Sequence, residues 1–164
     1  MRNHGSEKRS QHSFGFNSRL DDIHAGILSA KLKHIHAGNN ARRKLAKRYT
    51  KGLKKAKSFT LPYEVPGARH VFHLYVIETV NPAKRDEFLK FLNENGIDAK
   101  CHYPITITQQ AGFPWGKQAR IVGKMTNAER NAASCISLPM FPELTEAEVD
   151  YTIQKCMEWD KANA

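Results

Sequence analysis

The chain is poor in the features that mark membrane and secreted proteins. No apolar run approaches the ~20 residues needed to span a bilayer, and no stretch combines the basic, apolar and small-residue regions of a signal peptide. Its three cysteines, Cys101, Cys135 and Cys156, leave one over and include no pair close in sequence. This spacing argues against a secreted disulfide framework and against a CxxC-type metal site. A reducing cytoplasm is the expected location.

Negative charge is scarce in the first third of the chain. Residues 1–57 carry 15 Lys/Arg against 3 Asp/Glu, whereas residues 58–164 carry 11 against 13, so the net charge of +10 is local. The densest basic run is Arg42, Arg43, Lys44, Lys47, Arg48, Lys51, Lys54 and Lys55. Only one aromatic residue, Tyr49, lies within it for base stacking, so a solvated helix face is favoured over a nucleic-acid site. Steering of a nucleotide diphosphate is a further use for such residues.

An acidic start and an apolar repeat predict a long helix over residues 20–53. Asp21 and Asp22 can accept hydrogen bonds from the free amides of a first turn and suit its positive field. Apolar residues then recur at three-and-four spacing: Leu20, Ile23, Ile27, Leu28, Leu32 and Ile35. One face of this helix is therefore expected to be buried. The Gly-Asn-Asn run at 38–40 is expected to bend or break it.

The segments around this helix differ in pattern. Residues 1–18 have no period and are expected to be loop, and residues 54–68 form a connector containing two prolines. The run of β-branched and aromatic residues at 71–80 predicts a central strand. An Asn-Pro pair at 81–82 then opens a helix that Gly96 closes.

Further strands are expected at 98–103 and 135–138, on either side of a long loop over 104–125. Capping boxes at Thr126 and Thr145 predict two more helices. The last helix has four core candidates: Val149, Ile153, Met157 and Trp159. The order of elements predicts an α+β fold, in which a long linking helix precedes a small antiparallel sheet covered by helices.

Five segments in a fixed order carry a more specific signal. They are RNHG at 2–5, GFNSRLDDIHAGIL at 15–28, HLYVI at 73–77, GI at 96–97 with HYP at 102–104, and SLPMFPELT at 137–145. Together they resemble the DegT/StrS family of sugar aminotransferases, although Gly26 stands where that family usually has a second alanine. The resemblance covers the whole chain. It implies the C-terminal small domain of the type I aminotransferase fold.

In this family the cofactor lysine, the aspartate beside the pyridine nitrogen and most of the phosphate cup belong to a large domain upstream of RNHG. The resemblance therefore implies an interface loop left over from that domain at 1–19, a linking helix at 20–53 and a C-terminal small domain at 54–164. It also implies pyridoxal 5'-phosphate as cofactor, a nucleotide-sugar substrate, an amino-acid donor and a homodimer. No catalytic residue is expected in this chain, which alone is expected to be inactive.

Two residues of the second segment are candidates for cofactor binding. In the family its asparagine reaches the cofactor phosphate of the neighbouring subunit, and the amide of Asn17 is a suitable neutral donor. By residue type alone, a turn or helix cap is the more frequent role for asparagine. The guanidinium of Arg19 could hold a phosphate or carboxylate, or could equally pair with Asp21 or Asp22.

The HYP segment implies substrate contacts, because in the family it lies along the sugar-nucleotide pocket. His102 and Tyr103 are therefore expected to touch the substrate, although a proline ending a strand beside two half-buried residues has the same pattern. Family members often continue with a second proline, a histidine and a glutamine, where this chain has Thr106, Thr108 and Gln110. Thr108 and Gln110 complete the expected substrate-binding set. The two threonines leave the substrate subclass open.

The expected reaction is amino transfer, with glutamate as donor, to the keto group of a nucleotide-linked deoxysugar. No metal is expected, since His70 and His73 have no carboxylate or cysteine at ligand spacing. A dehydratase of the same fold, with histidine in place of the cofactor lysine, stays open. So does a binding or regulatory module, which would cover its apolar surface where a severed domain would expose it. A nucleic-acid-binding protein, the remaining alternative, would lose affinity steeply with salt.

Overall fold

The structure is a computed structural model that describes residues 6–7, 10–11, 20–110 and 120–163. It has the predicted α+β fold and divides into two compact units, residues 1–37 and 38–164. The first unit holds two short strands, β1 (Ser6–Glu7) and β2 (Ser10–Gln11), which pair antiparallel. The prediction of loop was wrong for these four residues, because strands this short rest on backbone hydrogen bonds and show no side-chain period.

Helix α1 (Asp22–Leu32) begins as predicted. The Asp21 carboxylate caps it by accepting a hydrogen bond from the His24 amide at 2.9 Å. The helix ends at Leu32. Just beyond it, the His34 amide donates to the carbonyl of Lys31, three residues earlier and not four as in an α-helix, at 3.0 Å. Helix α2 (Ile35–Leu53) follows at once. The predicted long helix is therefore two helices, interrupted at residues 33–34.

The predicted break at residues 38–40 was wrong, because these residues are helical within α2. Their weak helix propensity is outweighed by contacts with distant segments. A Cβ atom placed on Gly38 would lie 3.4 Å from the side chain of Pro142. The side-chain oxygen of Asn40 accepts a hydrogen bond from Arg69 at 2.5 Å. Tertiary packing thus keeps this stretch in the helix.

The apolar stripe of α1 is exposed, which contradicts the predicted burial. Leu20 and Leu32 are each 65% exposed and Ile23 is 77% exposed, and α1 contains no buried residue. By contrast, α2 buries four residues: Leu45, Ala46, Tyr49 and Leu53. The periodicity predicted a helix correctly. Burial also needs a partner surface, and the described part of the chain supplies none for α1.

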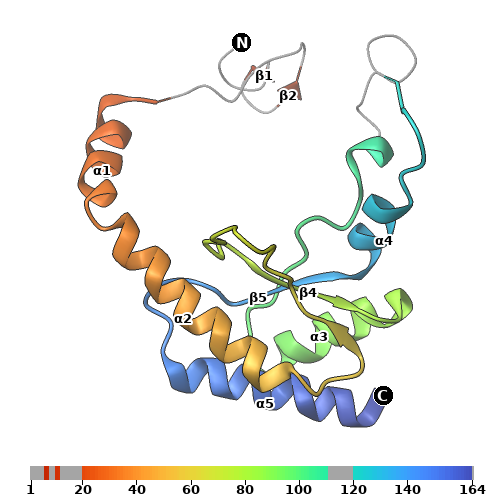
Figure 1. The fold of residues 1–164 in the computed structure, drawn as a ribbon. Helices are drawn as coiled ribbons and strands as arrows, with labels where there is room; N and C mark the ends of the chain where they lie inside the picture. The colour runs from red at the N-terminus through yellow and green to blue at the C-terminus, as the bar shows by residue number, and fades with distance from the viewer. Residues whose placement is uncertain (1–5, 8–9, 12–19, 111–119, 164) are drawn as a thin grey trace. The chain divides into compact units, whose positions relative to one another are not determined.

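The second unit is built on a three-stranded antiparallel sheet in the order β3-β4-β5 (Figure 1). Its strands are β3 (Phe59–Thr60), β4 (Tyr75–Thr79) and β5 (Cys135–Leu138). Strand β4 is central, and β5 has the bounds predicted for it. Strand β3 lies in the predicted connector, because two residues are too few to show an alternating pattern.

One face of the sheet forms the core of this unit. Tyr75, Ile77 and Thr79 alternate along β4 and are buried on this face. Phe59 lies directly opposite Thr79 and so shares the face. This alternation is the period-2 pattern of a strand with one face turned to the core.

Three helices close this core face. Tyr49 of α2 stacks on Tyr75 with ring centroids 4.9 Å apart, and Phe88 of α3 (Arg85–Glu94) stacks on Phe59 at 4.6 Å. Phe88 also meets Trp159 of α5 (Glu146–Asn163) at 5.3 Å. The aromatic rings thus tie α2, α3 and α5 to one side of the sheet.

The second face of the sheet is more polar. By register it carries Val76 and Glu78 of β4 opposite Ser137 and Cys135 of β5. Asn131 of α4 (Thr126–Ser134) donates a hydrogen bond to Glu78 at 2.8 Å. The main chain at Lys100 forms an isolated antiparallel bridge with Ser137. The strand predicted at 98–103 was therefore wrong, because pairing is limited to this one residue.

Besides the cap at Asp21, three predicted helix-end signals are confirmed. Asn81 accepts from the Ala83 amide at 3.1 Å and opens η1 (Pro82–Lys84), which leads into α3. Gly96, with φ of +74°, follows the end of α3 in the conformation that favours glycine. Thr145 and Glu148 form the predicted capping box, with the Thr145 amide 2.8 Å from the carboxylate.

The capping box predicted at Thr126 was wrong. Thr126 is the first residue of α4, and Met125 occupies the cap position without a side-chain hydrogen bond. A threonine followed three residues later by glutamate does not by itself decide which residue becomes the cap. In α5, Val149 is buried, while the other core candidates, Ile153, Met157 and Trp159, are half-buried against the core.

Candidate functional site

The second face of the sheet holds the HYP segment in place. Nδ1 of His102 lies 2.9 Å from Oγ of Ser137 on β5, and Ser137 is buried. Tyr103 meets the His102 ring edge-on at 5.6 Å and is 72% exposed. The imidazole is thus fixed by a buried hydroxyl, while the phenol is free to meet a ligand.

The threonines that depart from the family pattern form a separate cluster. Thr106 and Thr108 share a hydrogen bond between their hydroxyls at 2.6 Å, just before and within η2 (Ile107–Gln109). The Thr106 amide donates to the side chain of Gln109 at 2.8 Å. The Gln110 amide donates to the Ile107 carbonyl at 3.2 Å, and its side chain is exposed. The two hydroxyls are hydrogen-bonded to each other. Thr108 therefore does not offer a free donor in the place of the histidine that family members often have.

The expected substrate-binding residues therefore form two groups. His102 and Tyr103 belong to the sheet, whereas Thr108 and Gln110 belong to the turn that follows. Across the described ranges no hydrogen bond or ring contact joins the two groups. The two expected cofactor-binding residues, Asn17 and Arg19, lie outside the described residues.

Sequence reasoning missed four residues in the surroundings of His102: Cys101, Cys135, Arg85 and Ser137. Sγ of Cys101 lies 3.5 Å from Sγ of Cys135, and Nη1 of Arg85 donates to the Cys101 sulfur at 3.0 Å. Burial, and then the hydrogen bond with Cys101, raises the pKa of the Cys135 thiol to about 11. The cysteines are 34 residues apart, so no spacing rule could have paired them. Ser137 belongs to the SLPMFPELT segment, but only the register of β5 shows that its hydroxyl lies beside His102.

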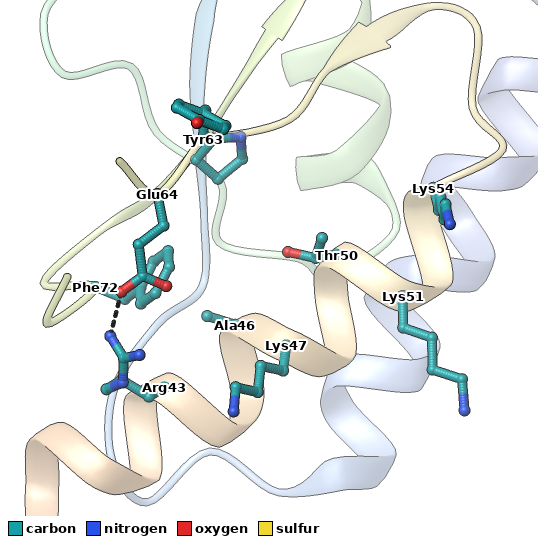
Figure 2. A pocket seen from close by; sticks show the side chains of 10 residues that line it. Arg43, Ala46, Lys47, Thr50, Lys51, Lys54, Tyr63, Glu64 and Phe72 are labelled. Carbon is teal, nitrogen blue, oxygen red and sulfur yellow. Dashed lines mark hydrogen bonds and ion pairs between the residues drawn. The ribbon is translucent and has the colours of Figure 1, made fainter. Parts of the chain in front are cut away.

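A pocket of about 530 Å³ lies along α2 (Figure 2), and no residue of the HYP segment lines it. Its lining is basic on the helix side and mixed on the other: Arg43, Lys47, Lys51 and Lys54 against Pro62, Tyr63, Glu64 and Phe72. Nη1 of Arg43 donates to Glu64 at 2.6 Å, and this hydrogen bond lowers the pKa of the Glu64 carboxyl. None of the four predicted site residues that the structure describes lines this pocket.

The two basic edges of α2 differ in their counter-charges. Arg48 holds both carboxylate oxygens of Asp150 at 2.6 Å, and Lys44 pairs with Glu146 at 2.6 Å. The hydrogen bonds raise the pKa of Arg48 and lower the pKa of both carboxyl groups. The lysines that line the pocket have no ion pair within the described part of the chain: Lys47, Lys51 and Lys54. The residues that line the helix side of the pocket therefore carry excess positive charge.

No described lysine has the environment of a covalent cofactor site. A lysine that forms such a bond needs a desolvated, neutral amine. Every lysine in the described ranges is at least partly exposed. The two half-buried ones, Lys84 and Lys155, pair with Glu87 and Glu158 at 2.7 and 2.8 Å.

The described residues include neither a membrane-spanning helix nor a metal-binding cluster. No helix there is long and apolar enough to cross a membrane. No group of three or more His, Cys, Asp and Glu residues in these ranges could hold a metal ion.

Comparison with known proteins extends over almost the whole chain. Residues 1–157 match the DegT/DnrJ/EryC1/StrS aminotransferase family. The chain is 40% identical over 162 residues to the "Pleiotropic regulatory protein" of Geobacillus stearothermophilus. It is 32% identical over 160 residues to dTDP-3-amino-3,4,6-trideoxy-alpha-D-glucose transaminase of Streptomyces venezuelae. Each alignment covers 97% of this chain but only 42% and 41% of the relatives, so the chain spans about two fifths of their length.

Solved structures give the same result. The crystal structure of S. venezuelae DesV matches with a TM-score of 0.78 and 33% identity, covering 98% of this chain and 42% of that one. NtdA from Bacillus subtilis, with bound cofactor PMP, matches with a TM-score of 0.73 and 27% identity, covering 98% and 38%. The family match and the shared fold together show that this chain belongs to the DegT/DnrJ/EryC1/StrS aminotransferase family.

Proposed function

We propose that this chain is the C-terminal part of a pyridoxal-phosphate-dependent aminotransferase acting on a nucleotide-linked keto-deoxysugar, with glutamate as amino donor. The observation that carries the proposal is the exposed stripe of α1. Six apolar residues at helical spacing are at least 47% exposed, four within α1 and one on either side of it: Leu20, Ile23, Ile27, Leu28, Leu32 and Ile35. A self-sufficient module would cover such a stripe.

The proposed cover for the stripe is the large domain of the same enzyme. The relatives and solved structures are more than twice as long as their aligned part, so a further domain is available in them to occupy this surface. On this basis the boundaries at 1–19, 20–53 and 54–164 describe the remnant of that domain, the linking helix and the small domain. The full enzyme is proposed to be a cytoplasmic homodimer.

The described residues do not fit the covalent part of a pyridoxal-phosphate site, because they include no buried lysine. When bound, this cofactor acts as an electron sink for the bonds around the amino group. Its attachment point is proposed to lie in the large domain. Asn17 and Arg19 are proposed to donate to its phosphate. The chain alone is proposed to be inactive for this reason.

The HYP segment is proposed as one wall of the sugar-nucleotide site. His102, anchored on Ser137, can donate to or accept from a sugar hydroxyl through its second ring nitrogen. Tyr103 offers an exposed phenol and ring face. Thr108 and Gln110 are proposed to add contacts from the following turn. The unpaired lysines of α2 supply a positive field that would draw in a diphosphate.

The first test reads the coding sequence immediately upstream of Met1. An in-frame lysine at a strand end within a few dozen residues supports the aminotransferase. A histidine there would move the reaction to dehydration of the sugar. An in-frame stop codon with no upstream domain would contradict the proposal and leave a binding or regulatory module.

An activity assay gives the second test. We expect the purified chain to transfer no amino group from glutamate to a nucleotide-linked ketosugar, and the extended protein to transfer it. We also expect the chain alone to bind a hydrophobic dye through the α1 stripe, and the extended protein to bind much less. Transfer by the chain alone would overturn the assignment of the cofactor lysine to another domain.

A further inference from the structure

The two thiols beside the HYP segment are close enough to react with each other. Their sulfur atoms are 3.5 Å apart. A disulfide has an S–S distance of about 2.05 Å, so the sulfurs must approach by roughly 1.5 Å. Cys135 is the first residue of β5, whereas Cys101 follows the single bridge at Lys100, after which pairing with the sheet stops. The Cys101 side can therefore move without breaking a strand.

The two cysteines also differ in access. Cys101 is half-buried, whereas Cys135 is fully buried. A small oxidant thus reaches Cys101 first. The third cysteine, Cys156, is fully buried in α5, and burial raises the pKa of its thiol to about 12. It lies in the core cluster, and among the described residues no contact joins its sulfur to that of another cysteine, so it serves as an internal control.

A mostly buried guanidinium, that of Arg85, lies beside the Cys101 sulfur. Its Nη1 donates to the Cys101 sulfur at 3.0 Å and to the Ala132 carbonyl at 3.1 Å. The side chain is mostly buried, with only 14% of its surface exposed. A fixed positive group beside the sulfur lies where it can stabilise the hydroxide that leaves when the sulfur attacks a peroxide. Asp86, which pairs with Nε of Arg85 at 2.6 Å, faces the other side of the guanidinium.

We propose that Cys101 and Cys135 form a redox-active thiol pair that a hydroperoxide converts into an intrachain disulfide. Cys101 is the attacking residue and Cys135 the resolving residue. This modification site is separate from the amino-transfer chemistry proposed above. Its assignment rests on the sulfur distance and on Arg85, and it stands whether or not the larger enzyme is an aminotransferase.

The reaction proceeds in two balanced steps. The Cys101 thiolate attacks one oxygen of hydrogen peroxide, the O–O bond breaks, and the leaving hydroxide takes up a proton to give water and a sulfenic acid. The Cys135 sulfur then attacks the Cys101 sulfur, its thiol proton is released, and the sulfenic hydroxyl leaves as a second water. Two thiols are oxidised by two electrons in total, and one peroxide is reduced to two waters.

The disulfide would change the surroundings of the HYP segment. It would tie residue 101 covalently to the first residue of β5. His102 follows Cys101 directly and is held on Ser137, two residues beyond Cys135. Oxidation would therefore fix the position of the HYP segment against the sheet.

The test treats the purified chain with equimolar hydrogen peroxide, blocks the remaining thiols and maps the digested peptides by mass spectrometry. We expect one intrachain cross-link between the peptides of Cys101 and Cys135, with Cys156 recovered as a blocked free thiol after unfolding. A dithiol reductant should restore both thiols. Absence of the cross-link, a cross-link to Cys156 in similar yield, or only intermolecular disulfides would overturn the proposal.

Substitutions separate the roles of the three residues. In Cys135→Ser, Cys101 should stop at the sulfenic acid, which dimedone traps, whereas the wild-type protein should give little trapped product. Arg85→Lys keeps the charge and should slow peroxide consumption less than Arg85→Met does. Circular dichroism verifies that each variant is folded. Equal oxidation rates in folded Arg85→Met and the wild type would overturn the role assigned to Arg85.

Discussion

Helices α1 and α2 follow one another in the chain and differ in what covers them. The stripe of α1 is exposed along its whole length, whereas α2 places Leu45, Tyr49 and Leu53 in the core. Hydrophobic periodicity reports the secondary structure that a segment adopts. Most of the stability of a helix comes from packing of its apolar face, and this depends on a second surface. The contrast therefore separates the formation of a helix, which its sequence predicts, from the burial of its apolar face, which needs a partner surface.

The largest expected effect comes from shortening one leucine in each helix. Leu53→Ala should cost about 2–5 kcal/mol of unfolding free energy, because Leu53 is 1% exposed and its removal leaves a cavity. Leu28→Ala, at a residue 56% exposed, should change stability by less than about 0.5 kcal/mol. Urea unfolding measures both. Similar losses for the two variants would mean that α1 is packed within this chain and would remove the contrast.

The second prediction concerns the polar contact beyond the end of α2. The carboxylate of Asp160, 5% exposed, accepts hydrogen bonds from the amides of Lys57 and Ser58 at 2.9 and 2.7 Å. Asp160→Ala should cost about 1–3 kcal/mol, because two amides lose their acceptor. Asp160→Asn keeps an acceptor oxygen and should cost less. Equal losses in urea unfolding would show that the negative charge, not the acceptor, is what matters.

The same carboxylate predicts a dependence on pH. Burial alone would raise the pKa of Asp160, but the hydrogen bonds from Ser58 and Lys57 outweigh it and lower the pKa below the ordinary value of 3.8. The stabilisation is therefore complete above pH about 3.8 and is lost as the pH falls through the lower, folded-state value. Unfolding followed from pH 6 down to pH 2 should show this loss in the wild type. Asp160→Asn should lack this component.

The third prediction uses one glycine in each helix. A Cβ at Gly26 of α1 meets nothing within 4 Å, whereas a Cβ at Gly52 of α2 would lie 2.7 and 2.8 Å from atoms of Ile153. Gly26→Ala should stabilise α1 by up to about 1 kcal/mol, because alanine is the better helix former. Gly52→Ala should destabilise the fold by about 1 kcal/mol net, because overpacking exceeds that gain. Amide hydrogen exchange in α1 and urea unfolding measure the two effects. If Gly52→Ala stabilises the fold, Ile153 or α5 can shift to accommodate the added methyl group at little cost in free energy.

The smallest expected effect concerns the charged edges of α2. Arg48→Met removes the exposed pair with Asp150, so it should lower the melting temperature slightly, and the difference should shrink as salt is added. Lys51→Met, on the edge without counter-charges, should leave the melting temperature unchanged or raise it, because it relieves repulsion. Thermal unfolding at low and high salt compares them. A larger loss for Lys51→Met would indicate an acidic partner for that edge.

Much of this molecule was determined by its sequence alone. The α+β class, the central strand at β4, the bounds of β5, the caps at Asp21, Asn81 and Thr145, and the family follow from local patterns or ordered motifs. These features depend on residues within a few positions of one another. Backbone hydrogen bonds and short side-chain contacts decide them before the chain is packed.

The tertiary structure decided the remaining features, which join distant residues. Residues 38–40 stay helical because the segments around Arg69 and Pro142 pack against them. Only the register of β5 places Ser137 beside His102 and Cys135 beside Cys101. Burial is likewise a property of two surfaces: the apolar face of α2 is covered, whereas the apolar residues of α1 are not. Local interactions determined which segments form helices and strands, and tertiary packing determined which of these elements contact one another.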